Sequence, residues 1–143
     1  MRDVPRQLEE LAELFEGRTR LVEKLAEQDD PLGSAHDVIR TLSEEEKLEA
    51  LNAHPAIGAR RLSVRSAAEQ GTDDEPETLA ELERLNREYE ERFGFRFVVF
   101  VNRRPKSEIV PILRERLERS REEELDTAVE ELVAIAEDRW RNS

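Results

Sequence analysis

Apolar side chains recur every three or four residues along most of this chain, which places them on one face of an α-helix. The pattern predicts a first helix from about Asp3 to Gly17 and a second that ends before residues 29–31. Two shorter helices are expected before residue 54. The strongest helical stretch carries Leu79, Leu82, Leu85, Tyr89 and Phe93. Two more helices are expected after residue 106, so most of the chain is predicted to be helical.

Polar residues at fixed spacings predict where several helices begin. Ser43 with Glu46, and Ser120 with Glu123, have the spacing of capping boxes, in which each side chain binds the other residue's main-chain N–H. Ser34 and Ser107 are expected to cap further helices, with Pro111 in the first turn of the second of these. Pro76 is suited to open a helix and Gly94 to end one.

The run FRFVVFV at residues 95–101 fits either a buried strand or a buried helical segment. No second strand-like run exists in the chain, and one strand cannot form a sheet. We therefore expect a buried extended or helical segment inside an all-α protein. The predicted architecture is a single-domain helical bundle of about seven or eight helices that spans residues 1–143.

The composition narrows the possible functions. With 35 acidic and 23 basic residues, the net charge of -12 repels phosphate backbones and disfavours nucleic-acid binding. Ordinary solvated helix faces explain such a surface, and adaptation to high salt is the alternative, which predicts greater stability in molar potassium chloride. The lack of cysteine excludes thiolate nucleophiles and cysteine-bound metals. No apolar run reaches the ~20 residues of a membrane span, so we expect a soluble cytoplasmic protein.

Residues 54–70 carry the candidate chemistry. His54 precedes Pro55, which disfavours the helical conformation for His54, so the imidazole is expected at a helix end, presented at a cleft and not packed. Histidine exchanges protons near neutral pH. Ser66, Glu69 and Gln70 share one face if they form a helical turn, and their hydroxyl, carboxylate and amide suit a small polar ligand.

The spacing alone leaves simpler interpretations open. A histidine before proline is often a loop residue, and Ser66 with Glu69 also has the spacing of a capping box. His36, the only other histidine, is interpreted as an exposed helix residue and is excluded from the site. The chain has no third imidazole and no His-Glu-x-x-His spacing, so no metal site is predicted.

Three separated motifs follow one another along the chain. They are His-Pro-x-Ile-Gly at 54–58, Ser-x-x-Glu-Gln at 66–70 and YEERFGFRFVVFV at 89–101, followed by the helical tail SREEELDTAVEELVAIAEDRW. In this order they resemble the 2-oxo-4-hydroxy-4-carboxy-5-ureidoimidazoline (OHCU) decarboxylases of urate breakdown, over most of the chain. The resemblance implies an all-α fold and a carboxy-lyase that converts OHCU to (S)-allantoin.

The resemblance also implies residue roles. His54 is expected to be the proton donor and Glu69 a second catalytic residue. The substrate-binding residues are expected to be Pro55, Ser66, Ala67, Ala68, Glu69, Gln70, Phe97, Val98, Val99, Phe100 and Val101. No cofactor or metal is expected, because a C=N bond of the substrate ring can accept the electrons that departing carbon dioxide leaves behind. The expected partners are a small-molecule substrate and a second copy of the chain in a homodimer, with exposed Leu or Phe side chains of residues 79–93 at the seam, and neither nucleic acid nor membrane.

Two positions depart from the family pattern. Many members have an acidic residue where this chain has Ala56, and many have proline where it has Arg96. Ala56 removes a carboxylate that would orient the imidazole. Two rival functions remain: a non-catalytic acidic module that binds a partner's basic helix, and a related decarboxylase that acts on another ureide ring.

Overall fold

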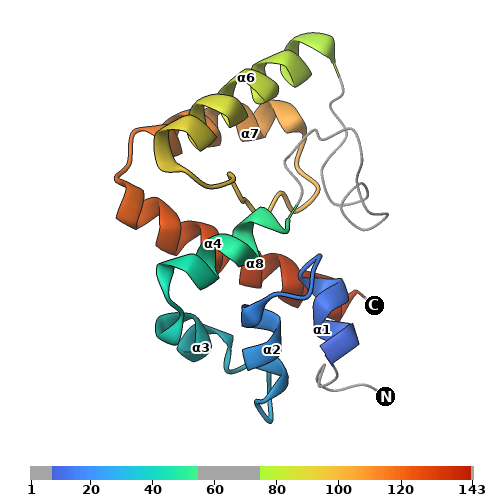
Figure 1. Cartoon of the computed structure of the whole chain (residues 1–143). Coiled ribbons are helices and arrows are strands. Elements are labelled where there is room, and N and C mark those ends of the chain that lie inside the picture. Colours follow the sequence, from blue (N-terminus) through green and yellow to red (C-terminus); the bar gives the residue numbers. More distant parts are fainter. Residues whose placement is uncertain (1–7, 55–74, 143) are drawn as a thin grey trace.

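The computed structural model describes residues 8–54 and 75–142, and these residues contain seven α-helices and no strand (Figure 1). The helices are α1 (Leu8–Leu14), α2 (Arg20–Ala26), α3 (Ala35–Thr41), α4 (Glu44–Asn52), α6 (Pro76–Phe93), α7 (Lys106–Leu117) and α8 (Arg121–Arg141). The predicted all-α bundle is confirmed, while the assignment of residues 1–143 to one domain stays a prediction. None of the described helices is long and apolar enough to cross a membrane.

The long helix α8 organises the bundle. It contacts α1, α3 and α4, and its apolar face, which includes Val129, Leu132 and Ala136, is buried. The helices α6 and α7 form a second pair (Figure 1). Residues 95–101 connect this pair and have neither helical nor strand structure, as the buried, isolated apolar run suggested. They reach both α7 and α8 through hydrogen bonds from Arg116 and to Glu131.

The helix ends show why local sequence fixes these boundaries. Both predicted capping boxes are present, at Ser43 with Glu46 and at Ser120 with Glu123. Gly94 ends α6 in the left-handed conformation (φ 80°), where its N–H donates to the Glu90 carbonyl at 2.8 Å. A further cap was not predicted: the Thr19 hydroxyl accepts the N–H of Val22 at the start of α2.

Two predicted caps are wrong. Ser34 precedes α3, but its side chain makes no capping hydrogen bond. Ser107 lies inside α7, because Pro105 already has a helix-initiating φ of -57° and the helix begins at Lys106. Pro111 therefore lies in the second turn, where its ring nitrogen cannot donate the helical hydrogen bond to residue 107.

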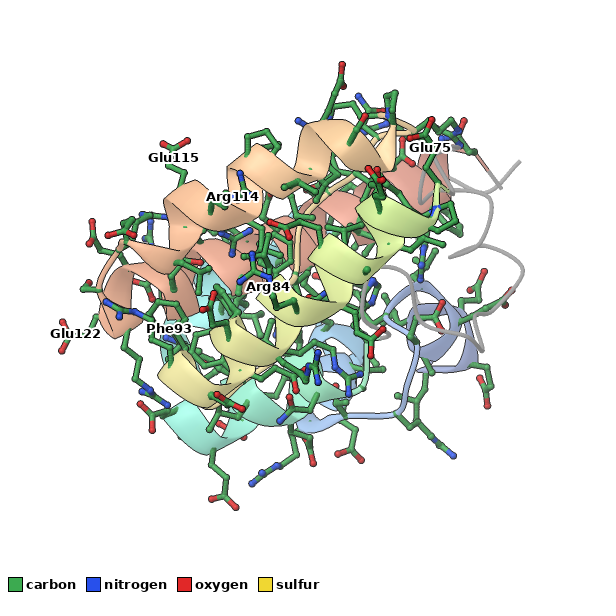
Figure 2. The ribbon with its side chains drawn as sticks, turned by 90° about the horizontal axis from the view of Figure 1, so that it is seen from above. Glu75, Arg84, Phe93, Arg114, Glu115 and Glu122 are labelled. Carbon is green, nitrogen blue, oxygen red and sulfur yellow. The ribbon has the colours of Figure 1, made fainter. Side chains whose placement is uncertain are left out.

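The apolar face of α6 is used inside the chain. Leu82, Leu85 and Phe93 are buried, whereas Leu79 is half-buried, so the dimer seam expected on this helix stays a prediction with few side chains left to form it. The ring of Tyr89 packs 5.8 Å from that of Phe95 between centroids, and 5.2 Å from that of Phe97. On the outer side, Arg84 and Arg114 both bind the Glu81 carboxylate and join α6 to α7 (Figure 2).

Candidate active site

His54 lies two residues beyond the last residue of α4. Its N–H donates to the Leu51 carbonyl at 3.2 Å, so the chain still follows the helical turn there. The helix-end position predicted for His54 is confirmed, but the prediction of a presented, unpacked ring is wrong, since His54 is only 7% exposed. One cause is the turn after α1: a Cβ at Gly17 would lie 3.1 Å from the Cβ of Ala53, so this turn packs directly on the end of α4.

Burial gives the imidazole an unusual protonation equilibrium. Loss of hydration lowers the pKa of His54 from 6.5 to about 4, and the positive charges of Arg139 and Arg96 act in the same direction. The carboxylate of Glu16 opposes them. His54 Nδ1 is buried and has no hydrogen-bond partner among the described residues. The resting site therefore contains a neutral imidazole with one polar atom available to a ligand.

Arg139 and Glu16 are site residues that sequence reasoning missed. Arg139 of α8 is 2% exposed, and its Nη1 donates to the Leu14 carbonyl at 2.9 Å and lies 3.1 Å from Glu16 Oε1. Glu16 has a positive φ of 62°, which is rare for a residue other than glycine and is typical of constrained turns. Arg139 carried one sequence signal, because it follows Ile135 and Ala136 on the apolar face of its helix.

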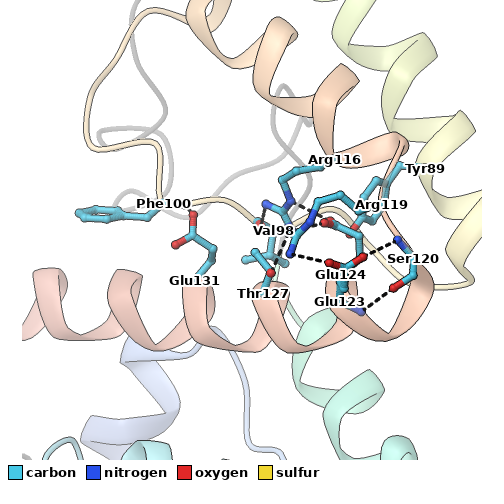
Figure 3. Close-up of polar contacts among 10 residues, drawn as sticks. All are labelled: Tyr89, Val98, Phe100, Arg116, Arg119, Ser120, Glu123, Glu124, Thr127 and Glu131. Carbon is cyan, nitrogen blue, oxygen red and sulfur yellow. Dashed lines mark hydrogen bonds and ion pairs between the residues drawn. The ribbon is translucent and has the colours of Figure 1, made fainter.

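The main chain of residues 98–101 is held by side chains of α7, of α8 and of the turn between residues 101 and 105. Arg116 Nη1 donates to the Val98 carbonyl at 2.7 Å, and Glu131 Oε1 accepts the Phe100 N–H at 3.3 Å (Figure 3). Arg104 donates to the carbonyls of Phe100 and Val101 at 2.7 and 2.9 Å. An uncoiled segment fixed in this way presents its remaining main-chain groups in a constant geometry.

Behind this segment lies a second buried set of polar side chains, which we call the Glu124 cluster: Tyr89, Arg116, Arg119 and Glu124. Glu124 is fully buried, and its carboxylate accepts hydrogen bonds from Tyr89 at 2.6 Å, from Arg116 at 2.7 Å and from Arg119 at 2.8 Å (Figure 3). The Arg116 guanidinium also lies 4.6 Å from the centre of the Phe97 ring. The cluster joins α6, α7 and α8 through one buried carboxylate that accepts three hydrogen bonds.

The structure describes only part of the predicted site. His54 and Phe97–Val101 are described, and all but the half-buried Phe100 are buried. Pro55 and the predicted binding residues Ser66, Ala67, Ala68, Glu69 and Gln70 lie outside the described residues, so their roles stay predictions. His36, excluded earlier, is exposed on α3. In the described part of the chain, no group of three acidic or histidine side chains could hold a metal ion.

These features define a class of protein. It is a small all-helical protein in which a buried neutral imidazole is influenced by two arginines, and one of them, Arg96, also joins the His54 carbonyl to the uncoiled segment. Such a set suits acid–base chemistry on a small anionic molecule, because the arginines attract the anion and the imidazole can exchange a proton with it.

Comparisons with known proteins identify the family. The family model for OHCU decarboxylase matches residues 3–141. An OHCU decarboxylase of Haloferax volcanii is 32% identical over 126 residues, which cover 84% of this chain and 74% of the relative. A uric acid degradation bifunctional protein of Bacillus sp. (strain TB-90) is 32% identical over 108 residues, covering 70% of this chain and 21% of that protein. This chain belongs to the OHCU decarboxylase family, and the resemblance inferred from its three motifs is confirmed.

Solved structures agree with this assignment. A crystal structure of an OHCU decarboxylase in the presence of (S)-allantoin matches with a TM-score of 0.76 and 25% identity, over 91% of this chain and 94% of that one. A crystal structure of (S)-allantoin synthase matches with a TM-score of 0.68 and 22% identity, over 92% of this chain and 47% of that one. The second match supports the fold alone.

Proposed function

We propose that this chain is a cofactor-independent decarboxylase that converts OHCU to (S)-allantoin, with His54 as the proton donor. The observation that carries this proposal is the buried imidazole of His54, whose Nδ1 has no hydrogen-bond partner among the described residues. A buried polar atom without a partner is costly and needs an explanation, such as a ligand or a water molecule, and strongly shifted pKa values cluster at functional sites. Because the chain belongs to a decarboxylase family, decarboxylation is the reaction in which this imidazole would take part.

The proposed reaction requires little of the protein. The bond between the ring carbon and its carboxylate breaks, carbon dioxide leaves, and the adjacent C=N bond of the substrate receives the electron pair. One proton must then reach one face of the ring, which sets the hand of the allantoin. The protein therefore has to orient the carboxylate and to hold one proton donor in place.

The charges around His54 support two roles in the site, one for the arginines in attracting the substrate carboxylate and one for the imidazole in donating the proton. Since the pKa of His54 is about 4, the imidazole is neutral at pH 7 before substrate binds. A substrate carboxylate next to the ring would raise this pKa, because an opposite charge favours the protonated form. The positive charges of Arg139 and Arg96 would attract the same carboxylate. Binding of the anionic substrate would therefore favour uptake of a proton by the imidazole, and His54 would then transfer this proton to the substrate ring.

The proposed binding residues are those that the resemblance implies. Pro55 and residues 66–70 would bind the ureido and ring groups, with Glu69 and Gln70 contributing their carboxylate and amide. Phe97–Val101 would complete the pocket with main-chain groups. The hydrogen bonds from Arg116 and Arg104 support this role, since they immobilise that main chain before any ligand arrives.

The proposal is tested by generating OHCU freshly from urate with its two upstream enzymes and following the optical activity of allantoin. With this protein present, we expect faster formation of optically active allantoin than in its absence. Racemic allantoin at the unassisted rate would contradict the proposal and favour the binding-module alternative. Acceleration with a different ureide only would instead reassign the substrate ring.

The homodimeric state and the cytoplasmic location are also part of the proposal. The homodimer rests on the family resemblance, and the cytoplasmic location rests on the composition of the sequence. Because Leu82, Leu85 and Phe93 of α6 are buried, little more than the half-buried Leu79 remains of the seam expected on this helix. Light scattering of the purified chain at micromolar concentration should give twice the mass of 16.7 kDa, and a monomer mass would contradict the homodimer.

A further inference from the structure

Arg96 lies between the two described parts of the candidate site. Its Nη1 donates to the carbonyl of His54 and, at 3.3 Å, to the carbonyl of Asn52. Its Nε lies 3.5 Å from Glu90 Oε1 of α6, an ion pair without hydrogen-bond geometry. One side chain therefore joins α6, the end of α4 and the start of the segment that continues into Phe97–Val101.

The neighbouring aromatic residues determine where Arg96 points. Phe95 and Phe97 are 2% and 1% exposed, and both rings pack against Tyr89 in the core. Arg96, placed between them in the sequence, is only half-buried. The two rings hold the main chain on both sides of residue 96, so the guanidinium extends from a fixed point toward α4.

The end of α4 is a suitable acceptor for a cation. The last carbonyls of a helix lack helical donors and carry the negative end of the helix dipole. Asn52 is the last residue of α4, and His54 follows in the same turn. The guanidinium binds both carbonyls at once and so restrains the main chain that carries the imidazole.

We propose that Arg96 is a positioning residue, which fixes the main chain of His54 relative to Phe97–Val101 so that the imidazole and the main-chain groups face one substrate in a constant geometry. This inference rests on the function proposed above for the same site. Position 96 is also one of the two departures from the family pattern. The restraint described here requires an arginine at this position.

The charges around His54 give the proposal a second readout. Among the described residues, Arg139 of α8, Glu16 of the turn after α1 and Arg96 act on this imidazole. Arg96 lowers the pKa of His54, so removal of its charge should raise that pKa. Arg96→Lys keeps the charge but lacks the guanidinium whose Nη1 donates to both carbonyls.

The experiment compares Arg96→Gln and Arg96→Lys with a matched control, Arg121→Gln. Arg121 Nε likewise donates to a carbonyl at a helix end, that of Phe93 at 2.9 Å, and its guanidinium lies 5.6 Å from the centre of the Phe95 ring. Each variant is assayed for kcat and KM with freshly generated OHCU, and for the titration of His54 by NMR. Exposed His36, the only other histidine, serves as the internal reference.

We expect Arg96→Gln to lower kcat on the order of 10- to 100-fold, because displacement of a reacting group by about 1 Å has an effect of this size. Its His54 should titrate at higher pH than in the wild type. Arg96→Lys should lower kcat by less and leave the His54 titration low. Arg121→Gln should leave both kcat and the titration unchanged.

A purely structural role for Arg96 predicts a different result. Arg96→Gln and Arg121→Gln would then both lose thermal stability but keep the wild-type kcat, and this outcome would overturn the proposal. If the wild type fails to accelerate the reaction, the proposed decarboxylase function is rejected. The titration still shows whether Arg96 acts on His54. An unchanged His54 titration in Arg96→Gln would show that Arg96 does not act on the imidazole and would overturn the proposal, and wild-type kcat in Arg96→Lys would overturn the positioning role.

Discussion

Two buried polar clusters lie close to residues 95–101, and they differ in how completely their partners are supplied. In the Glu124 cluster, a fully buried carboxylate accepts three hydrogen bonds of 2.6 to 2.8 Å from Tyr89, Arg116 and Arg119. We call the other set, Glu16, His54, Arg96 and Arg139, the His54 cluster. Here two cations and one carboxylate act on an imidazole whose Nδ1 has no partner among the described residues.

The difference separates a structural cluster from a functional one. A buried charge that is surrounded by donors stabilises one arrangement of its helices and has little left to offer a ligand. Arg116 Nη2 is also unpaired, but its guanidinium is neutralised by Glu124 and bonded to the Val98 carbonyl. Both clusters contain two arginines and one carboxylate, but only the His54 cluster also contains an imidazole with an unused ring nitrogen. An anionic ligand that accepts or donates a proton would complete it.

The largest expected effect is on activity. Replacing His54 by asparagine removes the imidazole that is the proposed proton donor. We therefore expect the acceleration of allantoin formation to fall by about 10² to 10⁴-fold with the fold intact. Circular dichroism would verify the helices. His36→Asn, at an exposed position, is the matched control and should retain full activity. Wild-type turnover in His54→Asn would remove the proposed mechanism.

Glu124→Ala should have the largest effect on stability. Without this carboxylate, the buried guanidinium of Arg116 and the hydroxyl of Tyr89 lose their partner, and breaking a buried ion pair costs about 3 to 5 kcal/mol. The adjacent Glu123 is exposed and closes the Ser120 capping box, so Glu123→Ala should cost only about 1 kcal/mol. Urea denaturation measures both. Equal losses would show that the cluster contributes no more than a surface cap.

The sequence predicted the features that depend on neighbouring residues. Capping boxes join residues three positions apart, and Gly94 stops α6 by its own conformational freedom, so both were predictable. The burial of residues 95–101 followed from their apolar run, but the sequence left open whether the segment would be extended or helical. His54 was predictable as a helix-end residue for the same local reason.

The rest of the site depends on packing between distant elements. Arg139 and Leu14 are 125 residues apart in sequence, and no sequence pattern predicts the hydrogen bond from Arg139 to the Leu14 carbonyl. The burial of His54 depends on the turn at Gly17 packing against Ala53, which a pattern along one helix cannot show. Arg96 was noticed as a departure from the family pattern, but its contact with the His54 carbonyl became visible only in the structure.

The third prediction concerns how the free energy of unfolding depends on pH through the His54 cluster. The folded protein holds the pKa of His54 at about 4, below the unfolded value of 6.5, so the unfolded chain binds a proton first as the pH falls. This group therefore has no effect on stability above pH 6.5 and destabilises the fold increasingly between pH 6.5 and 4, by about 3 kcal/mol. The difference in unfolding free energy between wild type and His54→Asn should change by this amount. A constant difference would mean that the imidazole is hydrated in the folded protein.

The smallest expected effect tests whether the Glu124 cluster is as complete as its geometry indicates. Tyr89→Phe keeps the ring that packs on Phe95 and Phe97 and removes only the hydroxyl that donates to Glu124 at 2.6 Å. Loss of a hydrogen bond to a buried charge costs about 2 kcal/mol. The loss should be smaller than in Glu124→Ala, because Arg116 and Arg119 still neutralise the carboxylate. Urea denaturation at pH 7 measures it. A loss as large as that of Glu124→Ala would mean that the hydroxyl, and not the paired arginines, holds the carboxylate in place. The two clusters would then differ less than their hydrogen bonds suggest.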